Sequence, residues 1–318
     1  MFELLIQNGN RIFAPVVLDN MTWETVRQGQ PGRLDFSVVK DDALDFHEGN
    51  AVSLKANGVN VFYGFVFTKE RDKDNVISVT AYDQLRYFKN KDTYVYSNKT
   101  VDELVRMVAA DFNLRTGTLE NTGFKIVSRI EDNKTLFDII QSALDLTLQN
   151  RRQMFVLYDD FGRLTLRNIA NMRLDLLIND ETAINYKYES SIDGETYNRV
   201  KLSYNNEETG KREIYIAQDS KNINRWGTLQ HFDTIDNKLS GRAKANALLG
   251  LYNHKTRNLS ITNAFGDVRV RAGCSVPVSL NLGDVVVRNF MLIEKVRHTF
   301  KRDEHMMNLT LRGGEFSA

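Results

Sequence analysis

Hydrophobic and polar residues alternate along the N-terminal part of the chain, as they do in strands that bury one face. The segment RLDFSVV places Leu34, Phe36 and Val38 on one side, and the segment AVSLKA at 51–56 repeats the alternation. Because successive side chains of a strand point to opposite faces, both segments predict half-buried strands. We count about five or six such strands before residue 83, enough for a small antiparallel barrel or sandwich.

The hydrophobic period lengthens to that of a helix after residue 90. Apolar residues recur three and four positions apart in the segments 98–114 and 133–150, which predicts two amphipathic helices. Thr100 followed by Glu103 forms the pattern of a capping box at the first helix start. Thr135 is the expected cap of the second helix.

A hairpin and a second strand-rich region follow these helices. The segment 154–169 reads MFVLYDDFGRLTLRNI, which predicts two short strands joined by a turn at Asp159–Gly162. Alternation returns at about residue 185, and a helical pattern at about 240–254, with Ser240 as the expected cap, interrupts it. The strands after that helix indicate a second barrel.

These changes of period predict a mainly β fold with an α+β insert, in which two small antiparallel β-barrels flank a mixed α/β domain. The first tube-like barrel is expected at residues 1–92, the small α/β insert at 93–182, and the second barrel with its inserted helix at 183–318.

Composition narrows the possible functions. The chain has 42 Lys and Arg against 41 Asp and Glu, so its net charge predicts neither a nucleic-acid binder nor an acidic-surface binder. No signal peptide is expected from the N-terminal pattern, and no segment approaches the ~18 apolar residues of a membrane span. The single Cys274 excludes an internal disulfide framework and is expected to be a buried small hydrophobe.

One carboxylate falls where a strand should bury an apolar residue. In the segment ISVTAYDQLRYFKN, Asp83 continues the apolar face of the strand 77–82. A catalytic acid and a structural cap are both compatible with that position. We expect the cap, because an aspartate at a strand end can accept amide hydrogen bonds from the next turn. Leu85 and Phe88 would then pack that turn inward.

The adjacent Asp159 and Asp160 are the other acidic candidates. A glycosidase needs two carboxylates roughly 5–10 Å apart across a cleft. Neighbouring residues on a turn point in different directions, which favours two polar residues at a hairpin tip. We therefore predict no catalytic residue, no cofactor and no enzymatic activity.

Two histidines, His298 and His305, flank the segment TFKRDE. In a hairpin centred on residues 302 and 303 they would be diagonal neighbours on one face. Two imidazoles are weak candidates for a metal site, since zinc sites use three or four protein ligands. A polar or half-buried sheet face is the favoured interpretation, so no metal is predicted.

Aromatic residues are concentrated in the first predicted barrel. Their number exceeds the needs of a small core, so part of them is expected to form a subunit interface. The candidate interface residues are Phe62, Tyr63, Phe65, Phe67 and Tyr87.

Several segments occur in a consistent order along most of the chain and resemble a known family. They include VFYGFVF, AYDQLRYFKNKDTYVYSNKT, YNRVKLSYNN, WGTLQHFDTIDNKL, VRAGCSVPV and LIEKVRHTFKRDEHMMNLTL. Together they are similar to the baseplate hub proteins of contractile phage tails, the XkdQ-type family of PBSX-like prophages and phage-tail-like bacteriocins.

The resemblance implies a structural homotrimer whose barrels form a pseudo-six-fold ring. That ring would adapt the six-fold tail tube above to the three-fold central spike below, with other baseplate and tape-measure proteins as further partners. DNA would only pass through if the particle is a phage. The implied location is the bacterial cytoplasm during assembly and then the baseplate of the virion or tail-like particle, without membrane insertion.

Two alternatives stay open from the sequence. One is a cell-wall-degrading tail component that uses carboxylates such as Asp83, Asp159 or Asp160. The other is a peptidoglycan-binding module in the insert at 91–180, whose pattern of helices and a hairpin is compatible with small wall-binding repeats.

Overall fold

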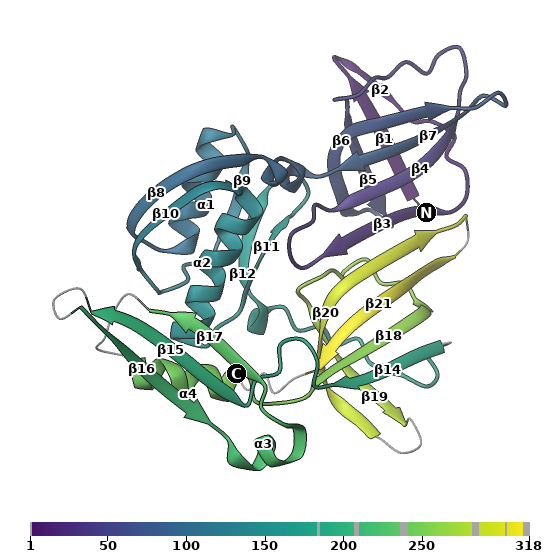
Figure 1. The fold of residues 1–318 in the computed structure, drawn as a ribbon. Coiled ribbons are helices and arrows are strands. Elements are labelled where there is room, and N and C mark those ends of the chain that lie inside the picture. Colours follow the sequence, from purple (N-terminus) through teal and green to yellow (C-terminus); the bar gives the residue numbers. More distant parts are fainter. Residues whose placement is uncertain are drawn as a thin grey trace. The chain divides into compact units, whose positions relative to one another are not determined.

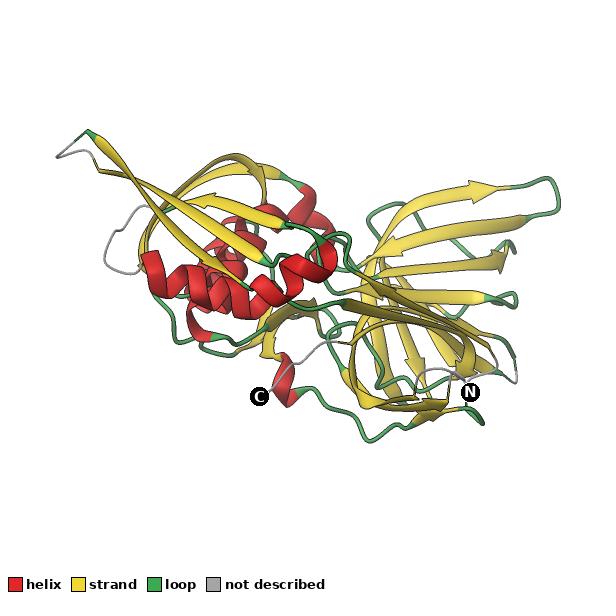
Figure 2. Cartoon of the chain, turned by 60° about the horizontal axis from the view of Figure 1, so that its bottom comes forward, coloured by secondary structure: helices red, strands yellow, loops and turns green. Residues whose placement is uncertain are grey.

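A computed structural model of the chain describes residues 2–182, 185–206, 210–235, 241–281, 286–302 and 304–313 (Figure 1). Strands make up 52% of the structure and helices 19%, which confirms the mainly β fold class (Figure 2). The chain divides into two compact units. Among the described residues, the first contains 2–187 and Leu259–Leu311, and the second contains Tyr188–Asn258 with residues 312 and 313.

The N-terminal strands form an antiparallel sheet that closes on itself into a barrel. The strand order is β2-β1-β5-β6-β7-β4-β3. The segment after β2 returns to β4, where Val17 bridges Val38 and the Leu18 amide donates to Ser37 at 2.8 Å. The strands are β1 (Phe2–Asn8), β2 (Arg11–Phe13), β3 (Met21–Val26), β4 (Arg33–Val39), β5 (Ala51–Ala56), β6 (Val59–Arg71) and β7 (Val76–Tyr82).

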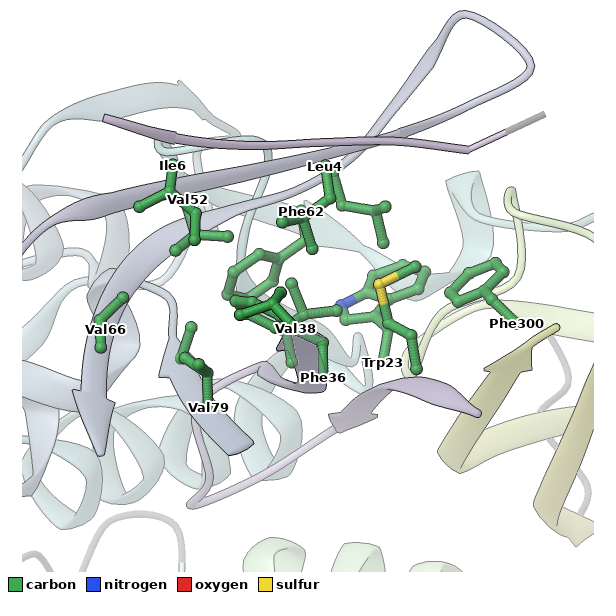
Figure 3. Packing of buried hydrophobic residues seen from close by; sticks show 14 of the residues in the cluster. Leu4, Ile6, Trp23, Phe36, Val38, Val52, Phe62, Val66, Val79 and Phe300 are labelled. Atoms are coloured by element: carbon green, nitrogen blue, oxygen red, sulfur yellow. The ribbon is translucent and has the colours of Figure 1, made fainter. Parts of the chain in front are cut away.

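The apolar residues of the predicted alternation form the core of this barrel. Leu34, Phe36 and Val38 of β4 are all buried, as expected from the sequence. Figure 3 shows this packing, with Phe300 entering beside Trp23 from a strand near the other end of the chain. Burial of apolar side chains on one strand face is what stabilises such a barrel.

That distant strand continues the sheet into a second group of strands. β20 (Val286–Phe300) pairs antiparallel with β3 over six residue pairs, from Lys295↔Val26 to Phe300↔Met21. On its other side the order is β20-β21-β18-β14. β19 pairs antiparallel with the first half of β20, and β13 pairs parallel with β19. The other strands are β13 (Ile178–Asn179), β14 (Asn185–Ser191), β18 (Thr256–Phe265), β19 (Ser275–Asn281) and β21 (His305–Gly313).

The insert contains both predicted helices. Thr100 and Glu103 form the capping box of α1, and Thr135 accepts a hydrogen bond from the Asp138 amide at the start of α2. The helices pack against two small sheets, β10-β8 and β11-β12-β9. The elements are the short 3-10 helix η1 (Gln84–Lys89), β8 (Lys91–Lys99), α1 (Val101–Asp111), β9 (Thr116–Leu119), β10 (Ile126–Thr135), α2 (Leu136–Arg151), β11 (Phe155–Asp159), β12 (Leu164–Asn168) and the short 3-10 helix η2 (Ile169–Asn171).

The second unit is a three-stranded sheet with one helix packed on it. Its strands are β15 (Arg199–Asn206), β16 (Lys211–Gln218) and β17 (Gln230–Thr234), and its helices are α3 (Ser220–Trp226) and α4 (Gly241–Tyr252). Side chains of α4, β15 and β16 share one core. The sequence pattern assigned these strands to the second barrel, but periodicity does not reveal which sheet a strand joins. Ser240, the expected cap of α4, lies outside the described residues, and the three domain boundaries stay predictions.

Candidate functional site

Asp83 lies in a buried polar cluster within the first unit. Its side chain is 5% exposed and caps η1, accepting from the Leu85 amide at 3.0 Å. The second carboxylate oxygen accepts from the Gly32 amide at 2.8 Å, so Asp83 also fixes the turn between β3 and β4. A Cβ on Gly32 would lie 2.4 Å from that oxygen, and only glycine leaves space for the contact.

Gln84, the first residue of η1, links this short helix to the end of β11 and to the residue before β9. The Gln84 Nε2 donates to the Asp159 carboxylate at 3.0 Å, and its Oε1 accepts from the Arg115 amide at 2.8 Å. Arg271, in the loop before β19, donates from Nη2 to the Asp159 carbonyl at 2.8 Å. We call the cluster of Asp83, Gln84, Asp159 and Arg271 the carboxylate joint.

The electrostatics of the carboxylate joint disfavour two charges. Burial raises the pKa of Asp83 well above its usual value, and the nearby charge of Asp159 raises it further. Burial also raises the pKa of Asp159, against hydrogen bonds from Gln84 and Gly162 that act to lower it. Arg271 lowers both pKa values, but as a smaller effect than burial.

The cavity at the carboxylate joint is too small for a substrate. It measures about 10 Å³ and is lined by both carboxylates and by Arg271. A volume of that size holds about one water molecule. Of the three acidic candidates, the structure brings Asp83 and Asp159 together, while Asp160 is exposed to solvent.

Sequence reasoning missed Gln84 and Arg271, since neither stands in a recognisable motif and Arg271 is 112 residues from Asp159.

The predicted interface aromatics divide between the core and the outer face of the first barrel. Phe62 is 3% exposed and belongs to the core. Tyr63, Phe65 and Phe67 are half-buried on the opposite face of β6, and Tyr87 contacts both phenylalanine rings at centroid distances of 6.5 and 6.2 Å.

The predicted turn at the hairpin tip carries Phe161. Phe161 and Gly162 both have positive φ angles, 48° and 82°, and on either side of them the Asp160 amide donates to the Arg163 carbonyl at 2.8 Å. This is the pattern of a type I′ turn, in which a bulky residue is unusual. The Phe161 ring packs 5.7 Å from that of Tyr63, and this contact attaches the hairpin to the first barrel.

His298 and His305 do lie side by side, with 2.9 Å between His298 Nδ1 and His305 Nε2. The Val270 carbonyl lies 2.9 Å from His298 Nε2 and can only accept, so that nitrogen carries a hydrogen. Neutral His298 then accepts at Nδ1, and His305 donates from Nε2. The two facing nitrogens are thus joined by a hydrogen bond. In the described part of the chain, no group of three His, Cys, Asp or Glu side chains could hold a metal.

Comparison with solved structures defines the class of the fold. A 43 kDa tail protein of prophage MuSo2 from Shewanella oneidensis aligns with a TM-score of 0.71 at 13% identity, covering 97% of this chain and 98% of that one. The E. coli c3393 protein aligns with a TM-score of 0.58 at 13% identity, covering 99% of this chain and 78% of that one. The fold is that of phage tail proteins.

Sequence comparison then gives the family. The model of the YqbQ-like family matches residues 21–312, so the chain belongs to this family. It is 29% identical to the phage-like element PBSX protein XkdQ of Bacillus subtilis strain 168, over 97% of this chain and 96% of that protein. The predicted resemblance to the XkdQ-type family is confirmed. None of the described helices has the length and apolarity to cross a bilayer.

Proposed function

We propose that this chain is a hub subunit of the baseplate of a contractile phage tail or tail-like bacteriocin, and that it assembles as a homotrimer. In this role it adapts the six-fold tail tube to a three-fold central spike. It would act as a structural part and not as an enzyme.

The observation that carries the proposal is the continuous sheet between the two β-rich ends. β3 and β20 join both groups of strands through backbone hydrogen bonds along six residue pairs. The seam is reinforced by the ion pair of the buried Arg27 with the half-buried Glu294, at 2.8 Å, and by Trp23 stacked on His298. Two barrels in each chain become six in a trimer, so one ring can match six-fold and three-fold neighbours.

A relative with the same fold supports this proposal. The E. coli c3393 protein is described as a component of the type VI secretion system with structural similarity to the T4 tail proteins gp27 and gp5. For this chain the proposed partners are two further copies of itself, a tube protein, a spike protein and other baseplate and tape-measure proteins. The proposed location is the cytoplasm during assembly and then the finished particle.

Electron microscopy of the purified full-length chain with its tube and spike proteins tests the proposal. We expect a ring of six barrel densities with three-fold symmetry. The double variant Phe65→Ser and Phe67→Ser removes two half-buried rings from the outer face of β6, and we expect it to lose the ring. Phe232→Ser, which changes a ring that is 53% exposed in the second unit, is the matched control. Single particles that never form rings would refute the hub role.

A further inference from the structure

We infer that the carboxylate joint is a proton-operated latch: one proton held by the Asp83–Asp159 pair keeps the β11–β12 hairpin seated on η1 and on the turn at Gly32, and loss of that proton releases the hairpin. The inference concerns the chain itself and does not depend on the proposed hub role.

The hydrogen-bond donors around the two carboxylates are almost all neutral. Asp83 accepts from the backbone amides of Gly32 and Leu85. Asp159 accepts from the Gly162 amide at 2.6 Å and from the Gln84 side chain. Both side chains are buried, with 5% and 6% exposure, and full charge on both would leave buried negative charge without a matching cation.

The charged groups near Asp83 and Asp159 do not neutralise two buried negative charges. Arg271 donates to the backbone carbonyl of Asp159, and its guanidinium lies 3.7 Å from the centroid of the Tyr158 ring. Asp160, next along the hairpin, adds negative charge and raises the pKa of Asp159. Arg33, beside Gly32, forms its ion pair with Asp35 at 2.8 Å and not with the joint. One cation thus faces two carboxylates, and the pair titrates as a unit.

Repulsion between two negative charges at Asp83 and Asp159 can be relieved only by movement of the hairpin. Asp83 cannot retreat toward the β3–β4 turn, because its oxygen already fills the space beside Gly32. Asp159 is part of the hairpin, whose tip holds Phe161 in a left-handed conformation that costs a bulky residue energy. The hydrogen bond from Gly162 to Asp159 stabilises this tip. Moving the hairpin outward would separate the charges, at the cost of the contact between the Phe161 and Tyr63 rings.

The direction of the pH dependence follows from proton binding. Both pKa values are higher in the folded chain than in the unfolded chain, where aspartate titrates at about 3.9. Above about pH 4 the folded state therefore holds more protons than the open state, and the opening equilibrium rises with pH. One extra proton corresponds to about a tenfold rise per pH unit, until the pair itself has ionised.

Hydrogen exchange on the full-length chain between pH 5 and 9 tests the latch. After correction for the intrinsic exchange rate, we expect protection of the hairpin residues 155–168 to fall by up to about tenfold per pH unit over part of this range. Protection of α2 should stay constant. In Asp159→Asn or Asp83→Asn the remaining buried acid loses its acidic neighbour, so the slope for the hairpin should end at a lower pH than in the unmodified chain. In the double variant Asp83→Asn and Asp159→Asn the slope should disappear, while Asp74→Asn, which changes an exposed acid, should keep the slope of the unmodified chain.

The slope is the decisive readout, because an asparagine also weakens one hydrogen bond and lowers absolute protection by a pH-independent amount. If either variant fails to fold, the slope for the hairpin in the unmodified chain still decides. Corrected protection that does not change with pH, or the same slope in the double variant Asp83→Asn and Asp159→Asn as in the unmodified chain, would overturn the inference.

Discussion

Acid should weaken the seam between β3 and β20 through His298 and His305. Burial lowers the pKa of His298 to about 3, and the neighbouring His305 adds to this effect. Burial lowers the pKa of His305 to about 4, with Asp267 acting in the opposite direction. A proton on His298 Nδ1 would face the Nε2 hydrogen of His305 and break the bond between the two rings.

The size of the effect follows from linkage. Unfolded histidine titrates near 6.5, so between pH 6.5 and the folded pKa values the unfolded chain holds more protons, and stability falls as the pH falls. At pH 4, which lies 2.5 units below the pKa of unfolded histidine, the linkage of His298 alone is about 1.4 kcal/mol for each unit, or roughly 3 to 4 kcal/mol. We assign His305 less than its full linkage energy, because it is partly exposed and solvent screens its charge.

Urea titrations at pH 7 and pH 4 measure the free energy of unfolding. The comparison is between the unmodified chain and His298→Gln, which keeps a hydrogen-bond donor but does not titrate. We expect the variant to lose about 3 kcal/mol less than the unmodified chain over this interval, because losses from other acidic groups cancel. His47→Gln, at an exposed histidine, is the control and should behave like the unmodified chain. Equal losses in His298→Gln and the unmodified chain would refute the reasoning.

Three substitutions test other contacts by urea unfolding at pH 7. Asp83→Ala should cost about 1 kcal/mol, the usual loss of a cap, and no change in stability would refute the capping role. Arg27→Leu should cost about 2 kcal/mol, because the buried guanidinium of Arg27 donates two hydrogen bonds to Glu294. Arg297→Leu should cost less than about 1 kcal/mol, because the Arg297 side chain is exposed and Glu24 keeps its ion pair with Lys295. Gly162→Ala should cost more than Gly194→Ala, because both have positive φ but only Gly162 lacks space for a Cβ; equal costs would contradict the packing.

Local sequence signals predicted the elements of the chain well. The alternation around Leu34, Phe36 and Val38 identified a core strand, and Thr100 and Thr135 marked both helix starts in the insert. These features depend on residues within one turn or one strand, where a short segment contains the whole signal. β8 was missed because its mostly polar sequence has only two buried tyrosines to show alternation.

Contacts between distant segments could not be predicted in the same way. Asp83 and Asp159 are 76 positions apart in the sequence, and Arg271 lies 112 positions further on. Each residue has an ordinary local explanation as a cap, a turn residue or a surface cation. Only the fold brings them into one buried cluster, because burial and the pairing of distant strands are properties of the whole unit.

The mass of the purified full-length chain in solution tests the hub proposal most directly. Light scattering coupled to size exclusion should give three times 36.5 kDa, about 110 kDa, for the chain alone or a multiple containing three copies with its spike protein. A stable species of 36.5 kDa that stays a monomer in the presence of tube and spike proteins would contradict the proposal.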